Sequence, residues 1–432
     1  MDFLDKDLLN IVDKLILDSN RKNKSASNYW YPLNYATFGK EEITSALQSM
    51  ITFQTSMHAK TKLFESMFSD QVGSDSAIFL NSGSSADLIA MNVLVKSPDY
   101  DVNKNDKVLV PAITWPTQIW AIIQSGLVPV LYDCDEFNFN PDVSRVPKSV
   151  LNEVKIIFTT HILGPCCDID NLLDICETKK IYLAEDACES LGTLYRGKQV
   201  GTFGEVGTFS SFFSHHLTTM EGGILCSKNK DLYNQAKLLR AHGWLRAIQN
   251  DGLDEFCLKR GISISDYMDI DSRYLFLDEG YNLRPTELNA SFCIQQLKKL
   301  KQFNLKRKKL SEAFYKEISK LKNLSAPKLV EGCEPCFMAL PFSVNSEKFG
   351  ALKSIKYLEE RGVESRPLIA GNILKHPVSK FIKLQSSNEE LKGANFHHHN
   401  SLYVGLSPNH SFEDIDRLIK VIQDLNKIID EN

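Results

Sequence analysis

The sequence contains no long hydrophobic run and no excess of basic charge. No apolar run approaches the roughly 20 residues that a membrane helix needs. The formal net charge is -4 over 432 residues, so electrostatics gives no reason to expect nucleic acid or an anionic membrane as a partner. The acidic, amphipathic start, residues 1–16, lacks the basic region and small-residue cleavage site of a signal peptide. These absences predict a cytoplasmic protein.

The sequence also lacks a recognisable set of metal ligands. Its ten cysteines are scattered, mostly in apolar segments, where a thiol packs as a small hydrophobe. Cys333-Glu-Pro-Cys336 is a CxxC pair, but a zinc site needs a second ligand pair at a suitable spacing. The run 397–399 consists of three histidines, and consecutive residues on a strand or loop point in different directions. We therefore predict no metal site.

Short β-rich apolar runs alternate with helical patterns from about residue 40 to residue 290. This alternation predicts an α/β fold with a mostly parallel central sheet flanked by helices. The length fits two domains. We expect an N-terminal helix and polar linker at 1–28, a large domain at 29–300 and a smaller C-terminal α/β domain at 301–432. Residues 247–277 are polar and irregular, which predicts a long loop or insertion.

Small, polar or aromatic residues follow several predicted strands, and ligands of parallel sheets bind at the carboxyl ends of strands. Gly83 and Ser84, in NSGSSA, open a helix whose amides can approach a phosphate, although a plain helix cap is the simpler alternative. Trp115 ends a second strand and either stacks on a planar ring or packs in the core. Asp186 ends a third strand, as a helix cap or as the partner of a buried cation.

A fourth strand ends at Ser210, a second hydroxyl for a phosphate, and His215 follows five residues later. The motifs NSGSSA, PAITWPT, EDACESLG, GTFSSFFSHHLTTMEGG and GYNLRPTEL stand in this order. Together they resemble the sugar aminotransferase family of fold-type I pyridoxal-phosphate enzymes, over about residues 30–420. The resemblance implies a pyridoxal or pyridoxamine 5'-phosphate cofactor bound by the large domain.

It also implies cofactor contacts for seven residues and a homodimer with shared active sites. The phosphate is held by Gly83, Ser84 and Ser210. The ring is stacked by Trp115, its nitrogen is held by Asp186, and Glu189 lies beside its oxygen. The seventh residue, Asn282, comes from the other subunit.

His215 stands where this family carries a lysine, counting back from Glu221-Gly222-Gly223. Imidazole cannot hold the cofactor covalently, but it can move protons near neutral pH. This departure is similar to the sugar 3-dehydratase branch, which implies His215 as the catalytic base and pyridoxamine phosphate bound without a covalent bond. The implied reaction removes the 3-hydroxyl of a nucleotide-linked 4-keto-6-deoxyhexose. The substrate that the resemblance favours is GDP-4-keto-6-deoxy-D-mannose. L-Glutamate then regenerates the amine, in the biosynthesis of colitose for lipopolysaccharide O-antigen.

Three other functions stay open at this point. A nucleotide-sugar aminotransferase would use His216 or a remote lysine. A CDP-hexulose 3-dehydratase working with a reductase would carry an iron–sulfur cluster, for which no closely spaced cysteine set is present. A non-catalytic cofactor-binding regulator would normally carry a DNA-binding helix-turn-helix, which the acidic N-terminal helix does not supply.

Two further residues, Arg366 and Asn372 in ESRPLIAGN, are expected near the substrate or the glutamate carboxylate. An arginine fork pairs both oxygens of a carboxylate, although a surface ion pair is an equally favoured alternative. For the histidine pair, the spacing assigns His215 and not His216 to the base position. If residues alternate there, one of the two faces the cofactor and the other packs or bonds elsewhere.

Overall fold

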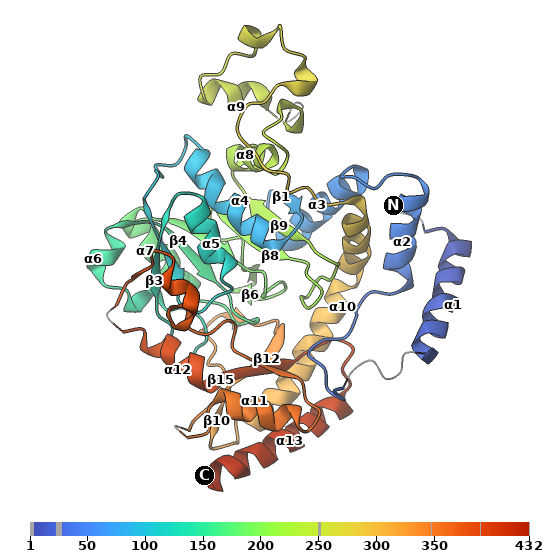
Figure 1. The fold of residues 1–432 in the computed structure, drawn as a ribbon, viewed down its shortest axis with the longest axis vertical. Helices are drawn as coiled ribbons and strands as arrows, with labels where there is room; N and C mark the ends of the chain where they lie inside the picture. The colour runs from blue at the N-terminus through green and yellow to red at the C-terminus, as the bar shows by residue number, and fades with distance from the viewer. Residues whose placement is uncertain (1–3, 23–27, 249–251, 347, 389, 432) are drawn as a thin grey trace.

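The computed structural model describes residues 4–22, 28–248, 252–346, 348–388 and 390–431 (Figure 1). A central sheet of eight strands has the order β1-β9-β8-β5-β4-β2-β3-β14. Its strands are β1 (Ser76–Leu80), β2 (Lys107–Pro111), β3 (Val128–Tyr132), β4 (Val154–Thr160), β5 (Tyr182–Asp186), β8 (Val206–Ser210), β9 (Gly223–Ser227) and β14 (Gln385–Ser386). Only β9 runs against its two neighbours, so the predicted mostly parallel sheet is confirmed.

Alternate residues of each strand enter two separate hydrophobic cores, because side chains of a strand point to opposite faces. Val108 and Val110 of β2 belong to one core, whereas Leu109 between them belongs to the other. The first core is covered by α4 (Gly83–Lys96), α5 (Thr117–Gln124) and α8 (Lys230–Arg240). The second is covered by α3 (Ala59–Val72), α7 (Ile169–Lys179) and the start of α10 (Glu287–Ile318). Burial on both faces explains why the strands are almost continuously apolar.

A third core lies in the C-terminal part, under a four-stranded sheet of order β10-β12-β15-β13. Its elements are β10 (Leu324–Ser325), β12 (Ala339–Val344), α11 (Ala351–Glu359), β13 (Ser365–Pro367), α12 (Lys392–Asn400), β15 (Ser401–Gly405) and α13 (Phe412–Glu431). Helix α10 joins the second and third cores, since Ile294 packs in one and Phe314 in the other. The helix therefore crosses residue 300, and the division of the chain there stays a prediction.

The remaining elements lie at the edges. Helix α1 (Lys6–Lys22) packs against α2 (Lys40–Ile51), and α2 packs against α10 (Figure 1). Part of the predicted linker, 23–27, lies outside the described residues. A small sheet joins β6 (Leu194–Tyr195), β7 (Lys198–Gln199) and β11 (Cys333–Glu334). Among the described residues, no helix combines the length and the apolar character needed to cross a membrane.

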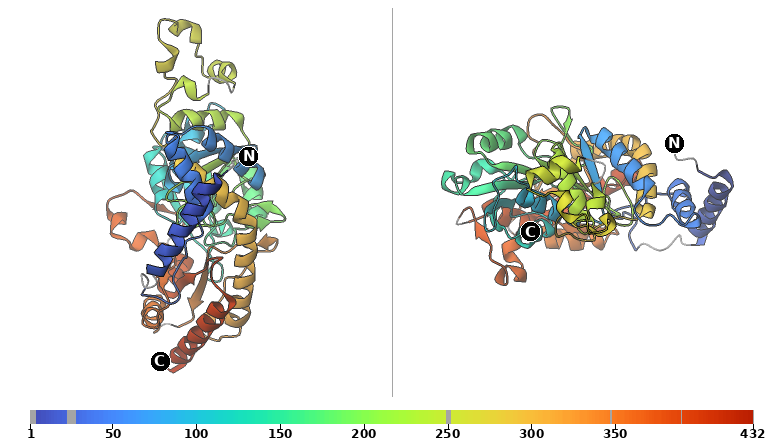
Figure 2. Two further views of the ribbon diagram at one scale, coloured as in Figure 1. Left: turned by 90° about the vertical axis from the view of Figure 1, so that its right-hand side faces the viewer. Right: turned by 90° about the horizontal axis from the view of Figure 1, so that it is seen from above.

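Of the two alternatives predicted for 247–277, a long loop or an insertion, the long loop was wrong in its local structure. Its described residues form α9 (Leu253–Lys259) and two short 3-10 helices, Ile264–Tyr267 and Ser272–Tyr274, beside a small cluster that includes Ile248 and Phe256. It stands away from the rest of the molecule at the top of Figure 1, and the left view of Figure 2 agrees. Its apolar residues are too few and too widely spaced to give a helical period in the sequence, which explains the error.

The three histidines at 397–399 lie on helix α12 and not on a strand or loop, which corrects the expected setting. Their rings nevertheless do not converge on one point: the ring centroids of His398 and His399 lie 4.9 Å apart, whereas His397 makes its contacts elsewhere. His397 is buried and bonds the carbonyl of Asp135 through Nε2, while His399 is exposed. Consecutive positions on a helix are turned by about 100° from one another, so neighbouring side chains again point different ways.

Candidate active site

The carboxyl ends of the parallel strands meet along one edge of the central sheet. Strand β1 is parallel to β8, because both run against β9. The residues that follow β1, β2, β4, β5 and β8 therefore lie along this edge, which is where ligands of such sheets bind. All strand-end residues singled out from the sequence are brought to this one edge.

Gly83, Ser84 and Ser210 form a small-residue cradle at the start of α4. A Cβ atom on Gly83 would lie 2.9 Å from Cβ of Ser210 and 3.2 Å from Sγ of Cys188. Ser84 Oγ donates a hydrogen bond to Thr117 Oγ1 at 3.0 Å, so a third hydroxyl joins the group. A helix N-terminus with several hydroxyls and no bulky side chain fits a phosphate.

Two acids, the buried Asp186 and the partly buried Glu189, stand next to this cradle. Asp186 is 5% exposed, and its Oδ1 accepts from the Cys188 amide at 3.0 Å. Burial raises the pKa of Asp186 above its usual range. Glu189 Oε2 accepts from the Leu163 amide at 2.9 Å. Burial, with the charge of Asp186 adding to it, raises the pKa of Glu189 to about 8. A protonated heterocycle placed against Asp186 would supply the missing positive charge, so the acids fit a pyridine ring.

The two adjacent histidines have different surroundings. Within the described part of the chain, Nδ1 of His215 is buried and has no hydrogen-bond partner. Burial lowers the pKa of His215 to about 4, and the Arg307 guanidinium adds to this. His216 is 1% exposed, and its Nε2–H donates to the Cys336 carbonyl at 2.9 Å. His216 is thus bonded through Nε2 to the segment leading to β12, while Nδ1 of each histidine has no hydrogen-bond partner among the described residues.

Arg307 is a buried cation that was not foreseen from the sequence. It lies on α10, is 1% exposed and donates to the carbonyls of Met338 and Leu406. Burial lowers its pKa to about 10. Its sequence surroundings, a run of lysines on a long helix, resemble an ordinary solvated face, so no local pattern marks it.

Trp115 and Asn282 lie at the carboxyl edge of the central sheet, and both side chains are exposed. Trp115 is 57% exposed. Asn282 is exposed, and its Oδ1 accepts from Arg284 Nε at 2.9 Å. The next residue along, Leu283, accepts from the Asn81 amide at 3.0 Å, so this segment runs beside the cradle of its own chain. The roles expected for Trp115 and Asn282 stay predictions.

Arg366 and Asn372 already have protein partners. Arg366 is paired with Glu364 at 2.8 Å and with Glu359 at 3.5 Å, and its side chain is 45% exposed. Asn372 is buried, and its Oδ1 accepts from the Leu374 amide while its Nδ2 donates to Asn395 at 3.0 Å. A contact of either residue with a substrate stays a prediction.

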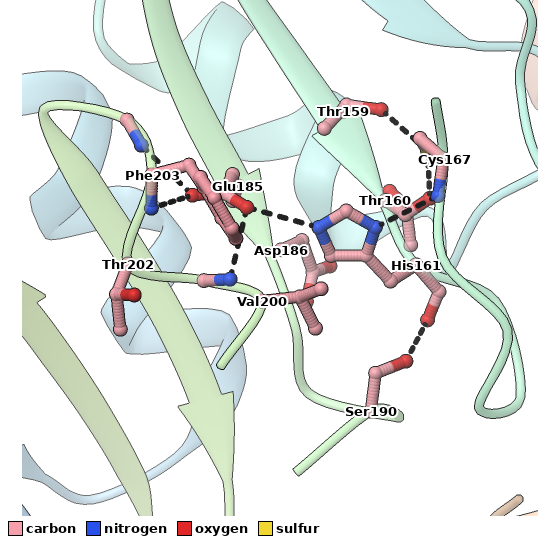
Figure 3. A network of polar contacts seen from close by, with 12 residues as sticks. Thr159, Thr160, His161, Cys167, Glu185, Asp186, Ser190, Val200, Thr202 and Phe203 are labelled. Atoms are coloured by element: carbon pink, nitrogen blue, oxygen red, sulfur yellow. Dashed lines mark hydrogen bonds and ion pairs between the residues drawn. The ribbon is translucent and has the colours of Figure 1, made fainter. Parts of the chain in front are cut away.

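A buried network behind Asp186, drawn in Figure 3, was missed from the sequence. His161 Nε2–H donates to Glu185 at 3.1 Å, and His161 Nδ1 accepts from the Cys167 amide at 3.2 Å. Glu185 also accepts from the amides of Gly201, Phe203 and Gly204 at 2.7–2.9 Å. Burial acts to raise the pKa of Glu185, but His161 and these amides together hold it below its usual range.

This network fixes the end of β5, because the His161 amide donates to the Asp186 carbonyl at 3.0 Å. Ser190 Oγ in turn donates to the His161 carbonyl at 2.6 Å (Figure 3). His161 directly follows strand β4, in TTHILG. Asp186 was singled out because ligands bind at the carboxyl ends of parallel strands. The same rule, applied to β4, would have identified His161.

Fold and site together define the class of fold-type I pyridoxal-phosphate enzymes. Residues 37–423 match the DegT/DnrJ/EryC1/StrS aminotransferase family. The chain belongs to this family.

Two similar proteins are GDP-4-keto-6-deoxy-D-mannose 3-dehydratases. The one from Yersinia pseudotuberculosis is 31% identical over 394 residues, which cover 91% of this chain and 98% of that protein. The one from Escherichia coli O55:H7 is 31% identical over 397 residues, with coverages of 91% and 99%. A solved GDP-4-keto-6-deoxymannose-3-dehydratase with a trapped PLP-glutamate geminal diamine superposes with a TM-score of 0.82 at 30% identity, covering 90% of this chain and 99% of that one.

We predict that Glu185→Gln lowers the free energy of unfolding at pH 7 by about 1–3 kcal/mol, because it leaves buried donors without an acceptor. Denaturant unfolding of the cofactor-free chain measures this, with the exposed Glu279→Gln as control. Since the pKa of folded Glu185 is lowered, its contribution is present above the unfolded pKa and is lost as the pH falls through the folded one. The difference between the two variants should therefore shrink below about pH 4; a constant difference would contradict the charged network.

Proposed function

We propose that this protein is a pyridoxamine-phosphate-dependent 3-dehydratase of nucleotide-linked 4-keto-6-deoxyhexoses. The observation that carries the proposal is His215, with its free ring nitrogen, at the position where the family's aminotransferases carry a lysine. The similarity to two GDP-4-keto-6-deoxy-D-mannose 3-dehydratases over nearly their whole length supports the same substrate, GDP-4-keto-6-deoxy-D-mannose. L-Glutamate is the amine donor that restores the cofactor.

In this proposal the cofactor is held without a covalent bond. Gly83, Ser84 and Ser210 bind its phosphate, Trp115 covers one face of the ring, and Asp186 pairs with the ring nitrogen. Glu189, whose raised pKa keeps it able to donate a proton, lies beside the ring oxygen. When bound, the cofactor supplies an amine for the 4-keto carbon and a ring that takes up electrons.

His215 moves the proton. Because its pKa is lowered to about 4, the imidazole is neutral at pH 7 and can accept a proton at its free Nδ1. The nearby Arg307 disfavours a second positive charge, so the proton is passed on readily. Its acceptor is the 3-hydroxyl, which leaves as water. Arg307 and the buried surroundings thus favour a base that returns its proton within the same turnover.

Three finer assignments complete the proposal. We place the enzyme in the cytoplasm, in the biosynthesis of a 3,6-dideoxysugar such as colitose for a surface polysaccharide. The smallest active unit is a homodimer in which Asn282 reaches the phosphate bound by the other subunit. The exposure of Asn282 and of Trp115 supports this, since a second chain would cover both.

The first prediction separates the two histidines. His215→Asn keeps a polar side chain but cannot exchange a proton, so dehydration should fall by about 100- to 10,000-fold while the cofactor still binds. His216→Asn should have a milder effect, because His216 holds the Cys336 carbonyl. His215→Lys should allow borohydride to fix the cofactor to residue 215, which it cannot do in the natural protein. Product formation and intact protein mass measure these outcomes. Loss of activity in His216→Asn alone would refute the assignment.

The second prediction concerns the shared site. Inactive Asn282→Ala and His215→Asn chains should recover part of the activity when mixed, since a heterodimer then contains one site with both natural residues. The assay uses dehydration of GDP-4-keto-6-deoxy-D-mannose after subunit exchange has been verified by mass. Exchange without any recovery would mean that each chain builds its site alone.

A further inference from the structure

Asp87 is a second acid buried at the Asp186 end of the site. It is the fifth residue of α4, it is 3% exposed, and its Oδ1 accepts from Thr208 Oγ1 at 2.7 Å. Thr208 on β8 is in turn the register partner of Asp186 on β5. The helix and two neighbouring strands thereby bring both acids to one place.

The two acids lie within reach of each other. One carboxylate oxygen of Asp87, one of Asp186 and Sγ of Cys188 are all within 4.8 Å of one another. Within the described residues, neither carboxylate forms an ion pair with a lysine or arginine. Both acids therefore lack a lysine or arginine partner in the described part of the chain, and of the two it is Asp186 whose pKa the nearby His161 acts to lower.

Ionisation of both of two buried carboxylates this close is strongly disfavoured, so the pKa of one of the pair is raised. Burial, followed by the charge of Asp186, raises the pKa of Asp87 well above its usual range. Among the groups that face the pair, the Cys188 amide and His161 act to lower the pKa of Asp186. Glu189 is a further acid coupled to Asp186. The surroundings thus favour ionisation of Asp186 and a proton on Asp87.

We propose that Asp87 and Asp186 share one proton, so that a neutral Asp87 leaves Asp186 as the single negative charge facing the cofactor ring. Thr208 occupies Oδ1 of Asp87, which leaves Oδ2 to carry the proton. Asp87 is then a positioning residue that acts through Asp186. The effect of a neutral Asp87 on cofactor binding rests on the proposed function. The shared proton does not, because it involves only residues of this chain.

The infrared band of protonated carboxyl groups tests the shared proton in the full-length, cofactor-free chain at pH 7. Glu189→Gln serves as the background, because it removes the other site acid with a raised pKa. The band should be present in Glu189→Gln and should disappear when Asp87→Asn is added. A band that persists would mean that Asp186 holds the proton alone, and the absence of a band in the background would mean that no proton is shared; either result overturns the proposal.

Two variants control this measurement. Asp133→Asn removes an equally buried carboxylate, which accepts from the amides of Gly393 and Ala394, and should leave the band unchanged. Thr208→Val removes only the hydroxyl donor and should move the band while preserving it. If Asp87→Asn fails to fold, this shift still tests the pair, and an unmoved band would contradict it.

Titration with pyridoxal 5'-phosphate at pH 7 then separates the two acids. Asp186→Asn should weaken binding by about tenfold or more, because a charged hydrogen bond to the ring is lost. Asp87→Asn should weaken it by less than about threefold, because the single charge on Asp186 remains. Equal losses would make Asp87 a direct ligand of the cofactor and overturn its role. Should dehydration never be observed, the infrared result would still stand, so the two proposals fail separately.

Discussion

The contact between Glu185 and His161 holds the carboxyl edge of the sheet in one shape. A fully buried carboxylate is stable only when its oxygens are occupied, and Glu185 accepts from His161 and from three backbone amides. These donors come from the loop after β4 and from the loop before β8. The next residue, Asp186, points to the other face of β5. Its position is fixed because this network fixes the end of the strand. The cradle, the acids and His215 are all arranged around that fixed strand end.

The exchange of lysine for histidine changes what the rest of the site must do. A covalently held cofactor stays in place by its bond alone. In the proposed function, with His215 at that position, retention depends on the cradle at Gly83, on the helix N-terminus and on the charge of Asp186. Burial, to which the nearby Arg307 adds, lowers the pKa of His215 and so fits this arrangement. In the proposed function, this one substitution removes the covalent bond to the cofactor and supplies a base that can move a proton.

Much of this arrangement could be predicted from the sequence, because it depends on local order along the chain. Alternating apolar runs predict the sheet, and the residues directly after each strand predict its edge. Side chains brought in from remote helices could not be predicted in this way. Arg307 reaches the site only because α10 packs under both parts of the molecule. Asp87 has the sequence context of an ordinary helix position, and its proximity to Asp186 requires the packing of α4 on β8. Helix α9 was not predicted because the few apolar residues of its segment show no helical period.

Incubation of the purified protein with GDP-4-keto-6-deoxy-D-mannose, pyridoxal 5'-phosphate and L-glutamate tests the central claim most directly. Mass spectrometry of the sugar product distinguishes the outcomes, and a panel of other nucleotide-linked 4-keto-6-deoxysugars shows the preference for the nucleotide and the sugar. The account predicts a product that has lost the 3-hydroxyl and carries no nitrogen on the sugar ring, together with one 2-oxoglutarate for each turnover. An amino sugar that keeps its 3-hydroxyl would contradict the account and identify an aminotransferase.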